Sequence, residues 1–171
     1  MPDSRNSRSV VLVGFMAAGK SKIGRALARQ LGLPFVDVDK SIEAEQGCSV
    51  ADIFREQGEA AFREAERAMI AQLLNGEPQI IAIGGGAFVD ERNRTALNAS
   101  SRTVWLDTPL ELILPRLSGS TTRPLAARMS ERELRALWTE RSAAYRTAHF
   151  RIDTSDADVD RIVDRIVAAL D

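Results

Sequence analysis

The sequence has very few residues that could form disulfides or hold a transition metal. It contains one cysteine, Cys48, and one histidine, His149. A single cysteine excludes an internal disulfide and a metal cluster held by several thiolates. We therefore interpret Cys48 as a bystander and His149 as a structural or surface residue.

Long apolar runs and an excess of one charge are also missing. No apolar stretch approaches the roughly 18–20 residues that a helix needs to cross a bilayer. The polar start, MPDSRNSRS, has no apolar signal core behind it. The formal net charge of −1 gives no general attraction to nucleic acid or to an anionic membrane. We expect a cytoplasmic, monomeric protein that binds small molecules, with no nucleic acid and no membrane partner.

Short apolar runs alternate with helical patterns along the 171 residues, a length that suits a single domain over residues 1–171. Runs rich in Val and Ile are typical of strands buried on both faces of a parallel sheet. The alternation predicts an α/β fold, a three-layer αβα sandwich around a central five-stranded parallel sheet. The expected strands are residues 9–14, 33–39, 79–86, 102–107 and 150–154. The expected helices are residues 21–32, 50–58, 59–74, 91–99, 130–146 and 158–170.

One stretch, LSGSTTRPLAARM at residues 117–129, interrupts this alternation. It is small and polar, and we predict a mobile loop between two helices, of the kind that often forms a lid. The helix after it should begin at Ser130, which has Glu133 at capping-box spacing.

The segment GFMAAGKS, residues 14–21, fits the pattern G-x-x-x-x-G-K-[ST] between an expected strand and an expected helix. Gly14 and Gly19 let the backbone curl, so that N–H groups and the helix N-terminus face a polyphosphate. Lys20 is expected to reach the β- and γ-phosphates, and the Ser21 hydroxyl to ligate Mg²⁺. The motif predicts a nucleoside triphosphate site. Because the Asn-Lys-x-Asp guanine reader is absent, ATP is the expected nucleotide.

Two carboxylates, Asp37 and Asp39, end the second expected strand. Strand side chains two residues apart point the same way, so these like charges would repel each other. That arrangement is unfavourable as structure alone and favours a functional role. Three glycines, Gly84–Gly86, lie at the end of the third expected strand and indicate a close approach to the backbone. Because ligands of such sheets bind beyond the carboxyl ends of the strands, we expect these residues and the phosphate loop to share one crevice.

Three charged residues fall on apolar helix faces. Glu66 lies in the middle of the apolar stripe of residues 59–74 and Arg63 at its edge, while Arg141 lies at the centre of another apolar face. Charged side chains are rarely buried unless they are paired or line a cavity. A surface pair of Arg63 with Glu66, and a snorkelling Arg141, remain the alternatives. Two inward arginines in one protein favour a shared anionic ligand.

With these residues the sequence resembles the shikimate kinases, a family of phosphate-loop proteins similar to the nucleoside monophosphate kinases. The resemblance covers almost the whole chain. It implies transfer of a phosphoryl group from ATP to the 3-hydroxyl of shikimate, which gives shikimate 3-phosphate and ADP in chorismate and aromatic amino acid biosynthesis. The matching segments are GFMAAGKSKIGRALARQLG, FVDVDKSIE, ADIF, EAAFREAE, GGGAF, TRPL and ERSAAY.

The resemblance also implies roles for residues. Asp37 and Ser21 would hold Mg²⁺, and Asp39 would bind a shikimate hydroxyl and act as the base, with Lys20 and Arg123 stabilising the transferring phosphoryl group. The implied shikimate-binding residues are Asp39, Arg63, Glu66, Gly84, Gly85, Gly86 and Arg141, with Glu66 orienting an arginine. The implied ATP-binding residues are Gly14, Ala17, Ala18, Gly19, Lys20, Ser21, Lys22, Arg116 and Arg123, with Arg116 stacking on adenine. Substrate-binding helices would span about residues 40–75 and a lid about residues 117–127.

This chain departs from the family pattern at three places. Ala17 stands where glycine is common, Lys22 stands where threonine is common, and RPLAARMS replaces the usual RPLL of the lid. Two other functions remain open. A kinase for gluconate or another polyhydroxy acid would share the phosphate loop, and a catalytically silent kinase-like domain should have lost Lys20, Asp39 or Arg123.

Overall fold

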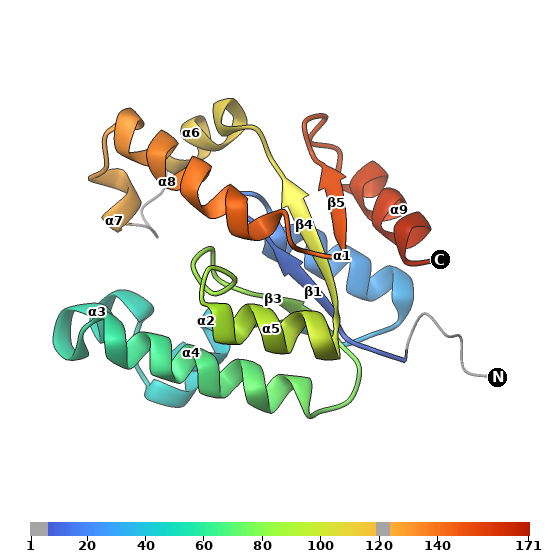
Figure 1. Ribbon diagram of the computed structural model, residues 1–171, viewed down its shortest axis with the longest axis horizontal. Helices are drawn as coiled ribbons and strands as arrows, with labels where there is room; N and C mark the ends of the chain where they lie inside the picture. Colours follow the sequence, from blue (N-terminus) through green and yellow to red (C-terminus); the bar gives the residue numbers. More distant parts are fainter. Residues whose placement is uncertain (1–6, 119–123) are drawn as a thin grey trace.

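A parallel sheet forms the centre of the protein, whose computed structural model describes residues 7–118 and 124–171 (Figure 1). The strands pair in the order β2-β3-β1-β4-β5, and all the pairs are parallel. The predicted five-stranded parallel sheet is therefore confirmed. The strands are β1 (Val10–Val13), β2 (Phe35–Asp37), β3 (Ile80–Ala82), β4 (Arg102–Asp107) and β5 (Phe150–Asp153).

Helices cover both faces of the sheet and complete the predicted three layers. α1 (Lys20–Leu31) and α9 (Val159–Leu170) lie together on one face, packed on Leu12 of β1. The remaining helices lie on the other face, where Val11 of the same strand enters a second core (Figure 1). Successive strand residues point to opposite faces, so one strand supplies both cores. The other helices are α2 (Val38–Gln46), α3 (Val50–Gln57), α4 (Glu59–Leu74), α5 (Glu91–Ser100), α6 (Leu110–Ser118), α7 (Pro124–Ala127) and α8 (Glu131–Tyr145).

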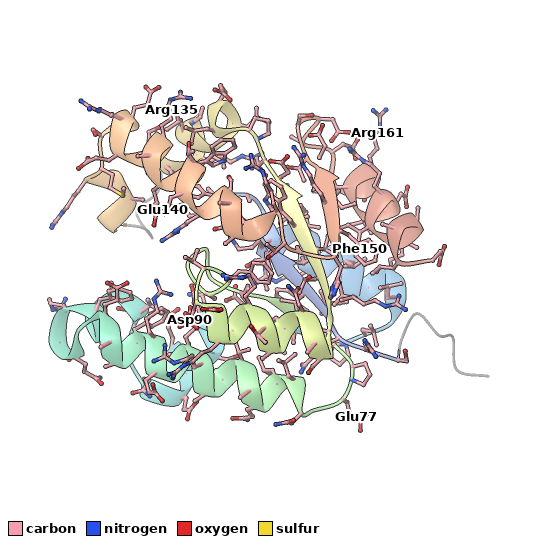
Figure 2. All side chains as sticks on the ribbon, in the orientation of Figure 1. Glu77, Asp90, Arg135, Glu140, Phe150 and Arg161 are labelled. Atoms are coloured by element: carbon pink, nitrogen blue, oxygen red, sulfur yellow. The ribbon has the colours of Figure 1, made fainter. Side chains whose placement is uncertain are left out.

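Charged side chains away from the sheet extend outward, as Arg135 on α8 and Arg161 on α9 show (Figure 2). The predicted capping box at the start of α8 is present, with both the Ser130 and the Glu133 side chains bonded to backbone N–H groups. In the part of the chain that the structure describes, no helix has the length and apolar character needed to cross a membrane.

The ends of two expected strands were wrong. β2 ends at Asp37 rather than at residue 39, because the Asp37 side chain accepts a hydrogen bond from the backbone N–H of Lys40 and caps α2. Asp39 therefore lies in the first turn of α2, not in a strand. Similarly, β3 ends at Ala82, and Gly84–Gly86 lie in the connection to α5.

The stretch expected to be a loop over residues 117–129 contains the one-turn helix α7. Residues 119–123 are outside the described part of the chain, so the predicted mobile lid is described only at its two ends. The predicted phosphoryl-stabilising residue Arg123 falls within this undescribed segment.

Candidate active site

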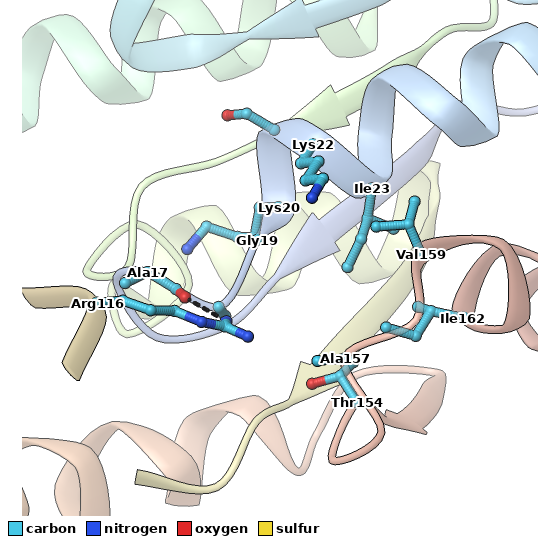
Figure 3. Close-up of a pocket in the computed structure, with 12 residues that line it drawn as sticks. Ala17, Gly19, Lys20, Lys22, Ile23, Arg116, Thr154, Ala157, Val159 and Ile162 are labelled. Carbon is cyan, nitrogen blue, oxygen red and sulfur yellow. Dashed lines mark hydrogen bonds between the residues drawn. The ribbon is translucent and has the colours of Figure 1, made fainter. Parts of the chain in front are cut away.

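Two adjoining pockets open at the carboxyl ends of the strands. The first has a volume of about 360 Å³ and lies between the phosphate loop, Arg116 and the connection from β5 to α9 (Figure 3). The second has a volume of about 110 Å³ and is lined by Asp37, Asp39, Gly84 and Gly85, among others. Lys20 and Ser21 line both pockets. The crevice expected from the sequence is therefore present, and its two chambers meet at the start of α1.

The phosphate loop is held in a curled form by side chains. The Lys20 ammonium donates hydrogen bonds to the carbonyl oxygens of Gly14 at 2.7 Å and Phe15 at 2.9 Å. Ala17 has a left-handed backbone with φ of 60°, and its carbonyl accepts a hydrogen bond of 2.9 Å from Arg116 of α6 (Figure 3). Lys20 and Arg116 thus bring two positive charges to the loop before any phosphate is bound.

Ser21 and Asp37 form the contact between the loop and β2. The Ser21 hydroxyl donates a hydrogen bond of 2.7 Å to Asp37 Oδ2. Among the described residues, no three His, Cys, Asp or Glu side chains gather as a metal site. Mg²⁺ in kinase sites usually takes only one or two protein ligands, with water and phosphate oxygens completing the shell. One hydroxyl beside one carboxylate fits that requirement.

Asp39 is half-buried and lines the second pocket. Burial, and next the neighbouring charge of Asp37, raise the pKa of Asp39, while Lys20 and Arg63 act in the opposite direction. Its Oδ1 is buried and has no hydrogen-bond partner among the described residues. A buried carboxylate oxygen without a partner is costly, so this oxygen is available to a ligand donor. Although Asp39 is helical, its carboxylate lines the same pocket as that of Asp37.

The glycine triplet brings charged side chains close to the backbone. A Cβ on Gly84 would lie 3.2 Å from Asp39 Oδ1, and one on Gly85 would lie 3.0 Å from a guanidinium nitrogen of Arg141. A Cβ on Gly86 would lie only 2.5 Å from a guanidinium nitrogen of Arg63. The expected close approach is confirmed, and the approaching groups are the charged side chains that the sequence singled out.

Arg63 and Glu66 pair inside the protein. Arg63 Nη1 lies 2.7 Å from Glu66 Oε1, and the exposed fractions of the two side chains are 22% and 0%. The alternative of a surface pair is therefore wrong. Burial raises the pKa of Glu66 to about 6, although the charge of Arg63 acts against this rise. Like Asp39 Oδ1, Glu66 Oε2 is buried without a partner among the described residues.

Arg141, on α8, lies against the glycine loop, which is the segment Gly84–Gly86. Its guanidinium carbon lies 5.7 Å from the centre of the Phe15 ring. One helical turn later, the Tyr145 hydroxyl donates a hydrogen bond to the carbonyl oxygen of Gly85. Because Arg141 faces Gly85 and Phe15, it does not snorkel to the outer surface of α8. Tyr145 was not predicted as a site residue, although its place on the same helix face as Arg141 is visible in the sequence.

The far wall of the first pocket was also not assigned from the sequence. It is formed by Thr154, Ala157, Val159 and Ile162, which follow the last strand and begin α9. The feature of the sequence that could have identified them is their position after a strand of the parallel sheet, where ligands of such sheets bind. His149 lies in neither pocket and exchanges hydrogen bonds with Thr103 of β4, so its structural interpretation is supported.

Three comparisons place these features beside known proteins. A family model described as shikimate kinase matches residues 16–171. A shikimate kinase from Paramagnetospirillum magneticum is 45% identical over 172 aligned residues, which cover 98% of this chain and 88% of that protein. One from Persephonella marina is 39% identical over 163 residues, 95% of this chain and 99% of that protein. A solved structure of the shikimate kinase from Acinetobacter baumannii in complex with shikimate has a TM-score of 0.89 and 35% identity, and covers 95% of this chain and 92% of that chain.

Proposed function

The chain belongs to the shikimate kinase family, and we propose on this basis that it transfers the γ-phosphoryl group of ATP to the 3-hydroxyl of shikimate. The products are ADP and shikimate 3-phosphate, an intermediate of chorismate and aromatic amino acid biosynthesis. One observation carries the proposal beyond family membership. A phosphate-loop pocket and a pocket of charged side chains meet at Lys20 and Ser21, where a phosphoryl group can pass between them.

ATP is assigned to the first pocket. The loop from Gly14 to Ser21 faces its phosphates with backbone N–H groups and with the Lys20 ammonium. We place the adenosine end toward Arg116, Ala157 and Ile162, because these residues line the first pocket and are not among those that line the pocket of Asp39. A planar guanidinium such as that of Arg116 can stack on an aromatic base.

Shikimate is assigned to the second pocket and the glycine loop beside it. Arg63 and Arg141 flank neighbouring glycines, and two guanidinium groups suit a carboxylate because each can donate paired hydrogen bonds. Glu66 holds Nη1 of Arg63 through one oxygen, and Glu59 lies 3.6 Å from its Nε, which leaves Nη2 for the ligand. This clamp would fix which hydroxyl of the acceptor faces Asp39.

Magnesium is assigned to Ser21 and Asp37, the adjacent hydroxyl and carboxylate at the junction of the pockets. When bound there, Mg²⁺ would neutralise charge on the β- and γ-phosphates. Phosphoryl transfer needs little covalent help from a protein, so positioning and charge neutralisation account for most of the acceleration. In our assignment Asp39 accepts the proton of the acceptor hydroxyl, while Lys20 and Arg123 neutralise the phosphoryl group.

We further propose that residues 1–171 form one catalytic domain, in which residues from the whole length of the chain line both pockets, and that it acts as a cytoplasmic monomer. Helices within about residues 40–75 bind the acceptor, and a lid over about residues 117–127 excludes water, the competing acceptor. Its substrates are shikimate and ATP; we assign it no nucleic acid and no membrane partner.

The direct test is incubation of the purified protein with ATP, Mg²⁺ and shikimate, followed by identification of the phosphorylated product. We expect ADP release and shikimate 3-phosphate. The same assay with gluconate and other polyhydroxy acids should give little ADP. Faster turnover of one of these acids would reject shikimate as the substrate, and nucleotide binding without any turnover would indicate a silent domain.

A further inference from the structure

Phe15, the second residue of the phosphate loop, is a buried aromatic residue to which the proposed reaction gives no role. It is 2% exposed and is not among the described residues that line the two pockets. Its carbonyl oxygen accepts a hydrogen bond of 2.9 Å from Lys20. The guanidinium carbon of Arg141 lies over its ring, 5.7 Å from the ring centre. This one residue of the phosphate loop therefore contacts both a proposed ATP ligand and a proposed shikimate ligand.

Arg141 and Arg63 are held in different ways. Arg63 contacts two acids, Glu59 at 3.6 Å and Glu66 at 2.7 Å. In the part of the chain that the structure describes, no aspartate or glutamate forms an ion pair with Arg141. Its guanidinium is half-buried and lies against the Phe15 ring and the glycine loop. Aromatic and backbone contacts, rather than acidic side chains, therefore surround this positive charge.

An aromatic face suits a guanidinium that has to bind a carboxylate. The negative face of the ring attracts the cation, and it offers no oxygen that would occupy the N–H donors. An acid in the place of Phe15 would pair with Arg141 and compete with an anionic ligand. The ring can therefore hold the guanidinium in position while its charge stays available to the ligand.

The glycine loop bounds Arg141 on another side. A Cβ on Gly85 would lie 3.0 Å from a guanidinium nitrogen of Arg141 and 3.4 Å from the backbone nitrogen of Met16. Gly85 is thus the point at which Arg141 and the phosphate loop approach each other. Met16 and Gly85 both line the acceptor pocket. A change in the Phe15 ring would therefore move Arg141 relative to a ligand in that pocket.

We propose that Phe15 is a positioning residue, which holds the Arg141 guanidinium in place for the carboxylate of the acceptor. The phosphate loop then faces the nucleotide with its backbone and orients the acceptor with one of its side chains. This inference rests on the proposed function, because it takes Arg141 to bind the shikimate carboxylate. An interaction that is equal before and during transfer contributes to acceptor affinity and not to the rate of the chemical step.

The test is a double-mutant cycle between Phe15→Leu and Arg141→Ala, with the affinity for shikimate measured by calorimetric titration. Leucine keeps an apolar side chain and removes the ring. We expect Phe15→Leu to weaken shikimate binding about two- to thirtyfold when Arg141 is present, and to have little effect in the Arg141→Ala background. Affinity for ATP should change little in each variant. Phe35→Leu is the matched control, because its ring lies 5.2 Å from the guanidinium carbon of Arg25, outside both pockets.

A second series of variants keeps the test decisive if leucine destabilises the core. Phenylalanine with one, two or three ring fluorines at position 15 keeps the shape of the side chain and weakens the negative face of the ring stepwise. Affinity for shikimate should fall with each added fluorine, while the melting temperature of the unliganded protein stays nearly constant. A ring that serves only to fill the core would give no such trend.

An equal loss of shikimate affinity from Phe15→Leu with and without Arg141 would overturn the inference, as would an affinity that does not follow fluorination. If the unmodified protein binds shikimate but transfers no phosphoryl group to it, the proposed function fails while the cycle still decides the role of Phe15. If the unmodified protein binds no shikimate, both proposals fail.

Discussion

Arg63 Nη1 lies 2.7 Å from Oε1 of Glu66, a carboxylate that is fully shielded from solvent. Only one of the two carboxylate oxygens is used in this way, because Glu66 Oε2 has no partner among the described residues. A buried acid with one partner holds its proton more strongly than a solvated acid. This pairing therefore affects both the stability of the fold and the shape of the acceptor site.

Replacing Glu66 with glutamine should flatten the pH dependence of stability. The folded-state pKa of Glu66 is raised from 4.5 to about 6. Its contribution to the free energy of unfolding is therefore complete below pH 4.5 and is lost as the pH rises through about 6. The expected loss is about 2 kcal/mol for a shift of this size. Urea unfolding from pH 4 to pH 7 measures it, and parallel profiles for the two proteins would contradict the assignment.

Replacing Arg141 with alanine should raise KM for shikimate roughly ten- to hundredfold, because a charge-assisted contact to the carboxylate is lost. KM for ATP should change little. Arg135→Ala is the matched control, because Arg135 lies on the outer side of the same helix and pairs with Glu131 (Figure 2). Steady-state kinetics with each substrate varied decides the matter. Equal effects on both substrates would reject the carboxylate clamp.

Replacing Asp39 with asparagine should lower kcat by about 10²- to 10⁴-fold, the usual contribution of a general base. Asparagine keeps the shape of the side chain and removes its ability to accept a proton. Affinity for ATP, measured by calorimetry, should stay within a few-fold of the original. Turnover equal to that of the unmodified protein would show that Asp39 is not the base.

Replacing Gly86 with alanine should impair acceptor binding more than folding. The new Cβ would lie 2.5 Å from a guanidinium nitrogen of Arg63. The flexible end of Arg63 can move, so stability should fall little, but the displaced guanidinium should raise KM for shikimate about tenfold or more. Gly76→Ala serves as the control, because its nearest neighbour would be the Leu73 carbonyl oxygen at 3.4 Å. An unchanged KM in Gly86→Ala would argue against Arg63 as a ligand.

Replacing Tyr145 with phenylalanine tests whether this buried residue positions the site. Burial raises the pKa of Tyr145, so its hydroxyl remains a neutral donor to the Gly85 carbonyl oxygen. Loss of the hydroxyl leaves that carbonyl without its donor and should cost about 1–3 kcal/mol of stability. If Tyr145 also aligns α8 with the glycine loop, KM for shikimate should rise several-fold at constant KM for ATP. Lower stability with unchanged kinetics would assign it a purely structural role.

The sequence was sufficient to predict the features that local pattern controls. The phosphate loop, the parallel strands and the capping box at Ser130 depend on nearby residues, and each is present. The second strand was predicted too long because the Asp37 side chain can cap a helix as easily as it can end a strand. Local propensity does not distinguish the two; the pairing of β2 with β3 does.

Other site features depend on contacts between distant segments. The inward direction of Arg63 and Arg141 followed from helix periodicity, but their meeting at the glycine loop required the packing of α4 and α8 around it. The wall formed by Ala157 and Ile162 lies far from the phosphate loop in the sequence, and no spacing rule connects the two. The charged residues that contact ligands were therefore predictable from the sequence. The residues that supply only a small or apolar part of the pocket wall were not.

Among the residues that the structure describes, the two chambers share Lys20 and Ser21 alone. The rest of the acceptor chamber is lined by Met16 of the phosphate loop, Asp37 of β2, Asp39 of α2, and the end of β3 with the residues after it. The rest of the nucleotide chamber is lined by the phosphate loop, α1, α6, α9 and the loop after β5. Substitutions in the elements that line the acceptor chamber can therefore change the acceptor while the ATP site is retained. A phosphate-donor module joined to an exchangeable acceptor module is a starting point for redesign, with substitutions at Gly84–Gly86 altering the choice of alcohol without rebuilding the site for ATP.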